Sequence, residues 1–344
     1  MRADTDRGIV AILHGAVRPD ASADEQDTLV QVGSVAQALK RLGWRSTAVP
    51  ITLDLAAMSR RLKQIDPAFV FNLVESIGGI GQHIHLAPNV LDAMGVPYTG
   101  CAAPALFQTS NKLLAKRRML ETGIPTPGWI ESDGFVGGAP RGRFIVKSAW
   151  EDASIGIDSS AVVDGIAAAR RRMAEMTARC GGTWFAESYI DGREFAVAML
   201  DDPERAREPL ALPVAETAFV DFPPDMPRIL DYASKWDKDS FAYRNTTHVL
   251  DLPEADRPIV DHLIELSARC WRLFELKGYA RVDFRVDRAG RPYVLEINPN
   301  PCLSPDADFA AMLEHAGISF DAGMDRIITA CLGPATVSAR RRTG

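Results

Sequence analysis

The strongest chemical pattern in this 344-residue sequence lies near its C-terminus, where two strand-like segments, 279–286 and 293–300, flank a turn. Residues two apart on a strand share a face. The apolar face of the predicted hairpin would carry Val282, Phe284, Val286, Leu295 and Ile297. The opposite face would carry Arg281, Asp283, Glu296 and Asn298. Carboxylate and amide oxygens suit a magnesium ion that also binds phosphates. A half-exposed sheet with its charges in solvent would show the same alternation.

Two lysines stand where an anion could be bound. Lys147 closes the apolar segment 143–147 and precedes the small-residue loop 148–156. A lysine is a compact charge that neutralises phosphate oxygens, and loop amides can add hydrogen bonds. Lys112 begins a helix that also carries three basic residues at 116–118, so a solvated cationic face is the simpler interpretation there.

Two glutamates flank the dipeptide Asp191-Gly192, which predicts a β-hairpin between segments 183–190 and 193–200. A carboxylate near an adenine amino group and another near ribose hydroxyls could orient a nucleotide. Glu187 and Glu194 are therefore candidates for that role. Two surface glutamates beside a hairpin would give the same spacing, so both interpretations stay open.

The candidate residues follow a part of the chain that alternates strands and helices, and they lie in parts whose strands pair as hairpins. Strands predicted at 8–13, 46–51 and 68–74 alternate with helices, an order typical of a parallel sheet. Later segments pair as hairpins between helices, which predicts antiparallel sheets. The fold class is therefore α/β and α+β, an N-terminal parallel α/β domain followed by two α+β domains. The predicted boundaries are 1–102, 103–186, 187–335 and a basic, disordered tail at 336–344.

The composition limits the function classes. A chain of this length with 47% hydrophobic residues suits two or three packed modules. The net charge of -6 leaves no uniform cationic surface for nucleic acid or an anionic membrane, and no segment reaches transmembrane length. Five scattered cysteines without a C-x-x-C pair predict neither a disulfide framework nor a zinc site, and indicate a reducing cytoplasm.

The order of these motifs resembles the ATP-grasp enzymes and, among them, the D-alanine–D-alanine ligases, over about residues 8–333. The similar segments are PYTG at 97–100, NK at 111–112, GIPTP at 123–127, VK at 146–147, ES-I-GREF at 187–195, YASKW at 232–236, ARVDF at 280–284 and VLEINPNP at 294–301. The resemblance implies an ATP-grasp fold whose two α+β domains enclose ATP. It also implies a carboxylate–amine ligase that works through an acyl phosphate.

The resemblance implies a role for each candidate residue. The nucleotide ligands would be Lys112 and Lys147 on the phosphates, Glu187, Ser188 and Ile190 at adenine, and Glu194 on the ribose. Asp283, Glu296 and Asn298 would bind two Mg²⁺ ions, which Mn²⁺ could replace. The catalytic group would be Arg281, Lys235, Glu25 and Ser154. The partners would be a small carboxylate, an amine and a second copy of the chain as a homodimer.

The sequence departs from the family near both substrates. Ala153 and Trp236 replace a serine and a tyrosine that join Glu25 in the family, and 75–85 lacks the acidic EDGT pattern, so D-alanine is not implied as the first substrate. The resemblance places Asp308 beside the second substrate.

At an effective dielectric near 20, Asp308 and its neighbour Asp306 would each repel a bound carboxylate by roughly 2–4 kcal/mol. The expected amine therefore lacks that carboxylate or carries a cationic group. Alternatively, Asp306 caps the helix that follows it.

Three functions stay open from the sequence. They are a ligase with altered substrate specificity, a genuine D-alanine–D-alanine ligase of cell-wall synthesis, and a nucleotide-binding regulatory relative without ligase activity.

Two further motifs, the histidine pair and Cys302, have interpretations that involve no chemistry. His83 and His85 lack an evident third ligand, so packing is favoured over metal binding. Cys302 is interpreted as a small uncharged residue and not as a nucleophile.

Overall fold

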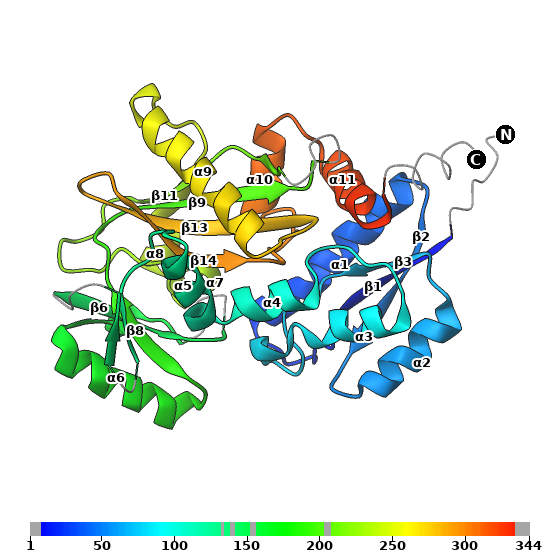
Figure 1. The fold of residues 1–344 in the computed structure, drawn as a ribbon, viewed down its shortest axis with the longest axis horizontal. Coiled ribbons are helices and arrows are strands. Elements are labelled where there is room, and N and C mark those ends of the chain that lie inside the picture. Colours follow the sequence, from blue (N-terminus) through cyan, green and yellow to red (C-terminus); the bar gives the residue numbers. More distant parts are fainter. Residues whose placement is uncertain (1–7, 132–133, 138–141, 152–155, 203–207, 334–344) are drawn as a thin grey trace.

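The computed structural model describes residues 8–131, 134–137, 142–151, 156–202 and 208–333. Within these ranges the chain forms three sheets, each the centre of one region of the fold (Figure 1). The prediction of a parallel sheet followed by antiparallel ones is confirmed. None of the helices in these ranges is both long and apolar enough to cross a membrane. The predicted tail at 336–344 lies outside the described residues.

The N-terminal sheet is parallel, with the strand order β2-β1-β3. Its elements are β1 (Ile9–Gly15), α1 (Ala23–Arg41), β2 (Arg45–Ile51), α2 (Leu55–Ile65), β3 (Phe69–Asn72), the 3-10 turn η1 (Gly81–His83) and α3 (Leu86–Met94). The central strand is buried on both faces: Val10 and Ile12 pack toward α1, while Ala11 and Leu13 pack toward α2 and α3. This explains why residues 9–13 form an unbroken apolar run.

The central sheet is antiparallel, with the order β5-β4-β8-β6-β7. Its elements are β4 (Trp129–Glu131), β5 (Gly134–Val136), β6 (Arg143–Ser148), η2 (Ser159–Ala161), β7 (Val162–Asp164), α6 (Gly165–Cys180) and β8 (Trp184–Ser188). Helix α6 covers one face, because Met173 and Met176 pack against Phe144 and Trp184. The other face is turned toward the C-terminal sheet (Figure 1).

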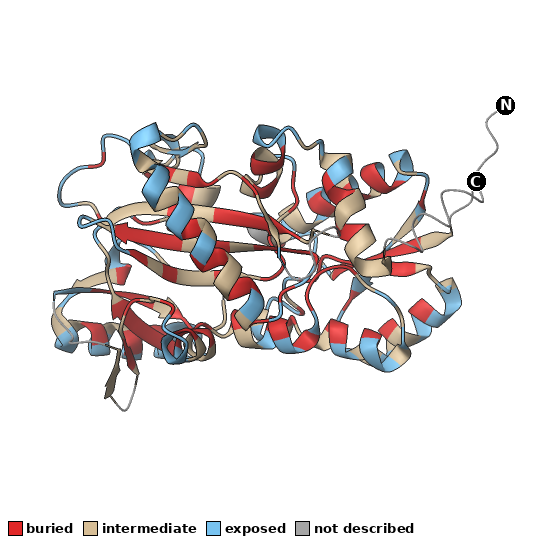
Figure 2. Cartoon of the chain, turned by 45° about the horizontal axis from the view of Figure 1, so that its top comes forward, coloured by how far each residue is buried: buried red, intermediate tan, exposed pale blue. Residues whose placement is uncertain are grey.

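The C-terminal sheet runs β12-β11-β9-β13-β14, with β10 beside β9. Its strands are β9 (Gly192–Leu200), β10 (Leu210–Ala211), β11 (Ala215–Phe219), β12 (Thr246–Val249), β13 (Tyr279–Asp287) and β14 (Pro292–Asn298). The helices around it are α4 (Ala103–Ser110), α5 (Lys112–Glu121), α7 (Tyr232–Trp236), α8 (Phe241–Arg244), η3 (Glu254–Asp256), α9 (Arg257–Leu273), α10 (Asp308–His315) and α11 (Phe320–Leu332). Figure 2 shows its central strands as largely buried.

The two faces of this sheet have different neighbours. Phe195, Val197 and Phe284 face a core shared with α4, α5 and α9. On the opposite face, Leu200 and Tyr279 are buried under α1, α10 and α11, while the far halves of β9 and β13 stay clear of that cluster. Helices α4 and α5, which fall within the predicted module 103–186, thus pack on the C-terminal sheet. The predicted module boundaries remain predictions.

The hairpin predicted at Asp191-Gly192 is wrong. Strand β8 pairs with β4 and β6 of the central sheet, whereas β9 pairs with β10, β11 and β13 of the C-terminal sheet. A glycine is needed at 192 because a Cβ there would lie 1.9 Å from the carbonyl oxygen of Val286. The dipeptide is therefore a crossing between two sheets, and its glycine permits close approach to β13.

The hairpin of β13 and β14 is confirmed, with one change in its register. Asp283 pairs with Glu296, but Phe284 pairs with Val294, so Leu295 is the extra residue of a β-bulge. Val294 takes the core position that the alternation predicts for Leu295. The prediction for Leu295 is therefore wrong, because the bulge turns it to the same side as Glu296. The other four apolar predictions, Val282, Phe284, Val286 and Ile297, are buried as expected.

Candidate active site

A cavity of about 970 Å³, including space open to solvent, lies where the central and C-terminal sheets face each other. Most of the residues predicted for the site line it: Lys112, Lys147, Glu187, Ser188, Ile190, Glu194, Lys235, Arg281, Asp283 and Glu296. They come from helices α5 and α7, strands β6, β8, β9, β13 and β14, and the crossing segment after β8. The structure therefore brings together residues that are far apart in the sequence.

Two carboxylates face each other at one end of this cavity. Asp283 and Glu296 are directly opposite in the β13–β14 register, where like charges repel. Burial raises the pKa of the Asp283 carboxyl above its usual range, and the nearby Glu296 adds to the rise. Arg281 opposes both effects through two hydrogen bonds, from Nε and Nη2 to the two oxygens of Asp283, at 2.8 and 2.9 Å.

The carboxyl of Glu296 is held ionised by cations on several elements. Burial alone would raise its pKa, but Lys112, Lys147 and Lys235, together with Arg281, lower it to about 2. The nearest of these is Lys112, whose Nζ lies 3.4 Å from Oε2 of Glu296. A permanently ionised carboxylate is ready to bind a cation without first losing a proton.

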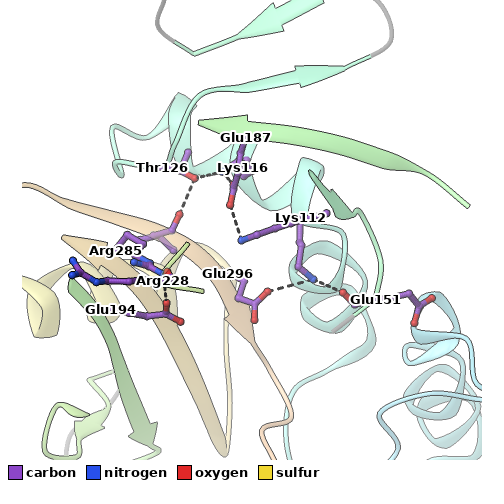
Figure 3. Close-up of polar contacts among 11 residues, drawn as sticks. Lys112, Lys116, Thr126, Glu151, Glu187, Glu194, Arg228, Arg285 and Glu296 are labelled. Atoms are coloured by element: carbon purple, nitrogen blue, oxygen red, sulfur yellow. Dashed lines mark hydrogen bonds and ion pairs between the residues drawn. The ribbon is translucent and has the colours of Figure 1, made fainter. Parts of the chain in front are cut away.

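Lys112 is fixed at the start of α5. The side chain of Asn111 caps this helix by accepting a hydrogen bond from the backbone N–H of Leu114 at 2.9 Å. The ammonium of Lys112 donates to the carbonyl oxygen of Glu151 at 2.9 Å and faces Glu296 on its other side (Figure 3). Only 5% of Lys112 is exposed. The interpretation of this position as a solvated cationic face is therefore wrong.

A buried triad joins β8 to two lysines. Glu187, 1% exposed, accepts from Nζ of Lys116 at its Oε2 at 2.7 Å; both residues are labelled in Figure 3. Its Oε1 accepts from Nζ of Lys147, also at 2.7 Å. Burial would raise the pKa of the Glu187 carboxyl, but the two lysines hold it below its usual range. Burial also lowers the pKa of the Lys116 ammonium, which Glu187 offsets only in part.

Glu194 lies at the end of the cavity away from Lys112. Its Oε2 is 2.6 Å from Nη2 of Arg285, a residue directly opposite it in the β9–β13 register. Ile190 and Tyr189, from the crossing segment, line the same part of the cavity. This end thus combines apolar side chains with one carboxylate.

Lys235 reaches the cavity from a short helix. The side chain of Asp231 caps α7 by accepting from the backbone N–H of Ser234 at 2.8 Å. The backbone N–H of Tyr232 donates to the carbonyl oxygen of Ile157 in the central region at 3.3 Å. The loop that carries Lys235 is therefore attached to the opposite wall of the cavity.

Three predicted site residues are not among the described residues that line the cavity. Asn298 lies opposite Arg281 in the register, and its Oδ1 accepts a hydrogen bond from the backbone N–H of Asn300 at 3.0 Å. Glu25, on α1, lies beside Gly79, where a Cβ would be 3.5 Å from its Oε1. Ser154 falls outside the described residues, as does Ala153.

The segment after β14 corrects one prediction. Ala307, and not Asp306, is the N-cap residue of α10, and no side chain caps that end, so the capping role of Asp306 is wrong. Asp308 lines the cavity instead, and its Oδ2 lies 3.5 Å from Nη1 of Arg281 while its Oδ1 lies 3.3 Å from Nδ1 of His248.

Cys302 packs against α1, where its Sγ donates to Asp27 at 3.0 Å. Burial raises the pKa of this thiol, which fits the interpretation that it is not a nucleophile. The ring of His83 lies with Nδ1 3.3 Å from the carbonyl oxygen of Ile77, and that of His85 with Nδ1 2.9 Å from the carbonyl oxygen of Gln82.

Three residues of the site were missed from the sequence. Lys116 lies four residues after Lys112 and so on the same helix face, a signal that was available. Arg285 shares its strand face with Arg281 and Asp283, which was also a usable signal. Glu151 could not be identified in this way. Its two carboxylate oxygens accept from the backbone N–H of Gly81, with N···O distances of 3.3 and 3.2 Å. Gly81 belongs to the N-terminal region, so no local pattern around Glu151 indicates this contact.

Comparisons with known proteins agree with this geometry. Residues 143–329 match the family model described as D-ala D-ala ligase C-terminus. The chain is 28% identical over 302 residues to the uncharacterized protein y4sG of Sinorhizobium fredii, covering 86% of this chain and 85% of that protein. It is 25% identical over 333 residues to a D-alanine–D-alanine ligase of Moorella thermoacetica, covering 94% of this chain and 99% of that enzyme.

Solved structures show the same fold. The D-alanine–D-alanine ligase of Bacillus anthracis superposes with a TM-score of 0.71 at 20% identity, over 98% of this chain and 100% of that one. The same ligase complexed with ATP gives 0.67 at 18% identity, over 98% and 99% of the two chains. The family model covers more than half of the chain. The chain therefore belongs to the D-alanine–D-alanine ligase family and is an ATP-dependent ligase with the ATP-grasp fold.

Proposed function

We propose that this ligase phosphorylates a small carboxylate with ATP and then joins the activated carbonyl carbon to the nitrogen of an amine. The observation that carries the proposal is the meeting of three cationic side chains with two facing carboxylates in one cavity: Lys112, Lys147, Arg281, Asp283 and Glu296. Phosphoryl transfer needs positioning and charge neutralisation more than covalent chemistry by the protein, and this set can supply both.

The two steps balance without a further reactant. The γ-phosphoryl group moves from ATP to a carboxylate oxygen, which leaves ADP and an acyl phosphate. The amine nitrogen then attacks the carbonyl carbon, the bond from that carbon to the phosphate oxygen breaks, and the nitrogen gives up a proton. Arg281 lies beside the reacting end of the cavity, where its fixed guanidinium would stabilise the negative charge that develops on oxygen.

The donor set fits magnesium. Asp283 and Glu296 offer hard oxygen ligands, and a divalent cation between them would relieve the repulsion of two facing carboxylates. Held by these residues, such an ion would supply charge neutralisation for the phosphates. Asn298 would approach from the end of β14 and would have to share its Oδ1 with the N–H of Asn300. Mn²⁺ could replace Mg²⁺, because both prefer oxygen ligands.

The nucleotide would lie along the sheet face. Lys112 and Lys147 would neutralise its phosphates, Glu187, Ser188 and Ile190 would lie at the adenine, and Glu194 would accept from the ribose hydroxyls. Lys235 enters the cavity from helix α7, where it could reach the transferred phosphoryl group. Ser154 and Glu25 would act on the carboxylate substrate, as the family resemblance implies.

The amine substrate is expected to differ from D-alanine. Asp308 lies in the cavity next to Arg281, so it partly neutralises the guanidinium that would otherwise attract a carboxylate of the second substrate. We therefore propose an amine that lacks this carboxylate or carries a cationic group. The alternative, a genuine D-alanine–D-alanine ligase of cell-wall synthesis, is favoured by the relatives that carry this name.

Phosphate release from ATP separates these functions. The enzyme would be incubated with Mg²⁺ or Mn²⁺ and a matrix of carboxylates and amines that includes D-alanine, and the mass of each product would identify the joined pair. Release that needs both substrates supports the ligase, and Asp283→Asn should abolish it while the exposed Asp261→Asn should not. ATP binding without carboxylate-dependent release would instead support a regulatory relative.

Location and assembly are part of the proposal. The five cysteines are all free thiols, which suits the reducing cytoplasm that the sequence predicts. A homodimer without nucleic-acid or membrane partners is likewise proposed, and the molar mass in solution measures it.

A further inference from the structure

A buried arginine lies at the nucleotide end of the cavity. Arg285 is on β13, two residues beyond Asp283 and on the same strand face, and its side chain is 5% exposed. Glu194 stands directly opposite on β9, 12% exposed, with its Oε2 2.6 Å from Nη2 of Arg285. Both residues line the cavity. The pair is thus part of the wall that a nucleotide would touch.

The spacing of residues along strand β13 indicates where the parts of a bound nucleotide would lie. Residues two apart on one face of a strand are separated by about 6.6–6.8 Å along it. If the phosphates lie at Asp283, the next position on this face is Arg285, so the group that follows the α-phosphate would lie there. In a nucleoside triphosphate that group is the ribose. The apolar side chain of Ile190, in the segment that leads into β9, also lines the cavity and suits the base.

Glu194 can accept from both hydroxyls of a ribose while it keeps its arginine. A carboxylate has two oxygens with about four lone-pair sites, and Arg285 engages Oε2. Two neighbouring hydroxyl donors match two carboxylate oxygens only if the carboxylate plane points toward them. The orientation of Glu194 therefore matters as much as its charge.

Arg285 is fixed independently of Glu194. Its Nη1 donates to the carbonyl oxygen of Gly192 at 3.0 Å. Its Nη2 also donates to the carbonyl oxygen of Arg228 (Figure 3). The hydroxyl of Tyr189 makes two more contacts with Arg228, accepting from its N–H at 3.2 Å and donating to its carbonyl oxygen at 3.3 Å. The guanidinium is therefore anchored to the backbone and can in turn orient the carboxylate of Glu194.

We propose that Arg285 is a positioning residue that aims Glu194 at the ribose and thereby makes the ligase select ribonucleotides over 2′-deoxyribonucleotides. The inference rests on the proposed function, because it uses the placement of the phosphates at Asp283. It adds a residue that acts through Glu194 and does not touch the reacting atoms.

The test is equilibrium binding of ATP and 2′-deoxyATP with Mg²⁺, measured by calorimetry without carboxylate or amine. Losing a hydrogen bond to an ionised group weakens binding by about tenfold or more, so wild-type protein should prefer ATP by about that factor. Arg285→Met keeps much of the apolar stem of the side chain but removes its charge. We expect this variant to lower the preference for ATP to about twofold, mainly by weakening the binding of ATP. Arg285→Lys should give an intermediate preference.

Two controls separate positioning from general damage. Arg288→Met makes the same change in an exposed arginine that pairs with Asp191 on the surface, and it should leave the preference unchanged. Glu194→Gln should lower the preference, and adding Arg285→Met to it should lower it no further, because both changes remove one interaction.

If Arg285→Met keeps the wild-type preference, or binds both nucleotides more weakly by the same factor, the role of Arg285 is overturned but the proposed function is not. Wild-type protein that binds neither nucleotide overturns the proposed function with it. Thermal unfolding of each variant shows which ones are folded, and the Arg285→Lys preference decides the matter if Arg285→Met does not fold.

Discussion

The buried triad of Glu187, Lys116 and Lys147 contains one more positive than negative charge, so one lysine can leave while the other still pairs with Glu187. Lys147 lines the cavity and is 13% exposed, whereas Lys116 is fully buried and is held by Thr126 at 2.8 Å as well as by Glu187. Under the proposed function, Lys147 would turn to a phosphate while Lys116 remains with Glu187. Lys116 would act as the permanent counter-ion of the site.

Lys116→Met tests this division of roles. The methionine keeps most of the apolar stem against Trp129 but removes the ammonium. Breaking a buried ion pair by removing one partner costs about 3–5 kcal/mol when the other charge is left uncompensated. Because Lys147 still contacts Glu187 at 2.7 Å, we expect a smaller loss in the free energy of unfolding, about 2–3 kcal/mol. We also expect the KM for ATP to rise about tenfold, since Lys147 is then retained by Glu187.

Urea unfolding at pH 7 and steady-state kinetics measure the two effects. The double variant Lys116→Met/Glu187→Gln leaves no unpaired carboxylate, so it should be more stable than Lys116→Met alone. Lys63→Met, at an exposed position of α2, is the matched control and should change neither quantity. A Lys116→Met protein that loses under about 1 kcal/mol, with an unchanged KM for ATP, would refute the reasoning.

Three further predictions concern single residues. Asp308→Ser should raise kcat/KM for D-alanine as the second substrate by about tenfold, because it removes a charge that repels carboxylates, and an unchanged value would show that Asp308 does not discriminate. Glu296 has a folded pKa of about 2, below its usual 4.5, so it stabilises the fold fully above pH 4.5 and progressively less as the pH falls toward 2. Urea midpoints of Glu296→Gln should therefore fall less steeply than those of the wild type in this range, and parallel curves would contradict the assignment. Because burial raises the pKa of Cys302, iodoacetamide at pH 8 should modify the exposed Cys180 well before it, and mass mapping with the opposite order would contradict its burial.

Local patterns predicted the hairpin face because side-chain parity in a strand does not depend on the rest of the fold. Arg281 and Asp283 fall on one face for this reason, and the structure places them there. The position of Leu295 could not be found in the same way. A bulge is a property of how two strands pair, and the sequence of one strand does not contain the register of its partner.

Two other failures share a cause. Asp191-Gly192 signals a tight local path of the chain but does not say which sheet each flanking strand joins. The burial of Lys116 depends on Glu187, 71 positions later in the sequence. In both cases the deciding contact is non-local, and single-sequence reasoning had only the resemblance to the family to supply it.

The ion pairs of the cavity suggest how nucleotide and metal binding are linked. In the structure, four cations that line the cavity each contact a carboxylate: Lys112 with Glu296, Lys147 with Glu187, Arg281 with Asp283, and Arg285 with Glu194. A phosphate that pairs with Lys112 and Arg281 removes these cations from Glu296 and Asp283. The two carboxylates then lie beside the negative charge of the phosphate. Divalent cations restore the balance, so the affinity for nucleotide and the affinity for metal must rise together. The two anchored pairs, at Glu187 and Glu194, need no such exchange, because Lys116 and the backbone-held Arg285 stay in place.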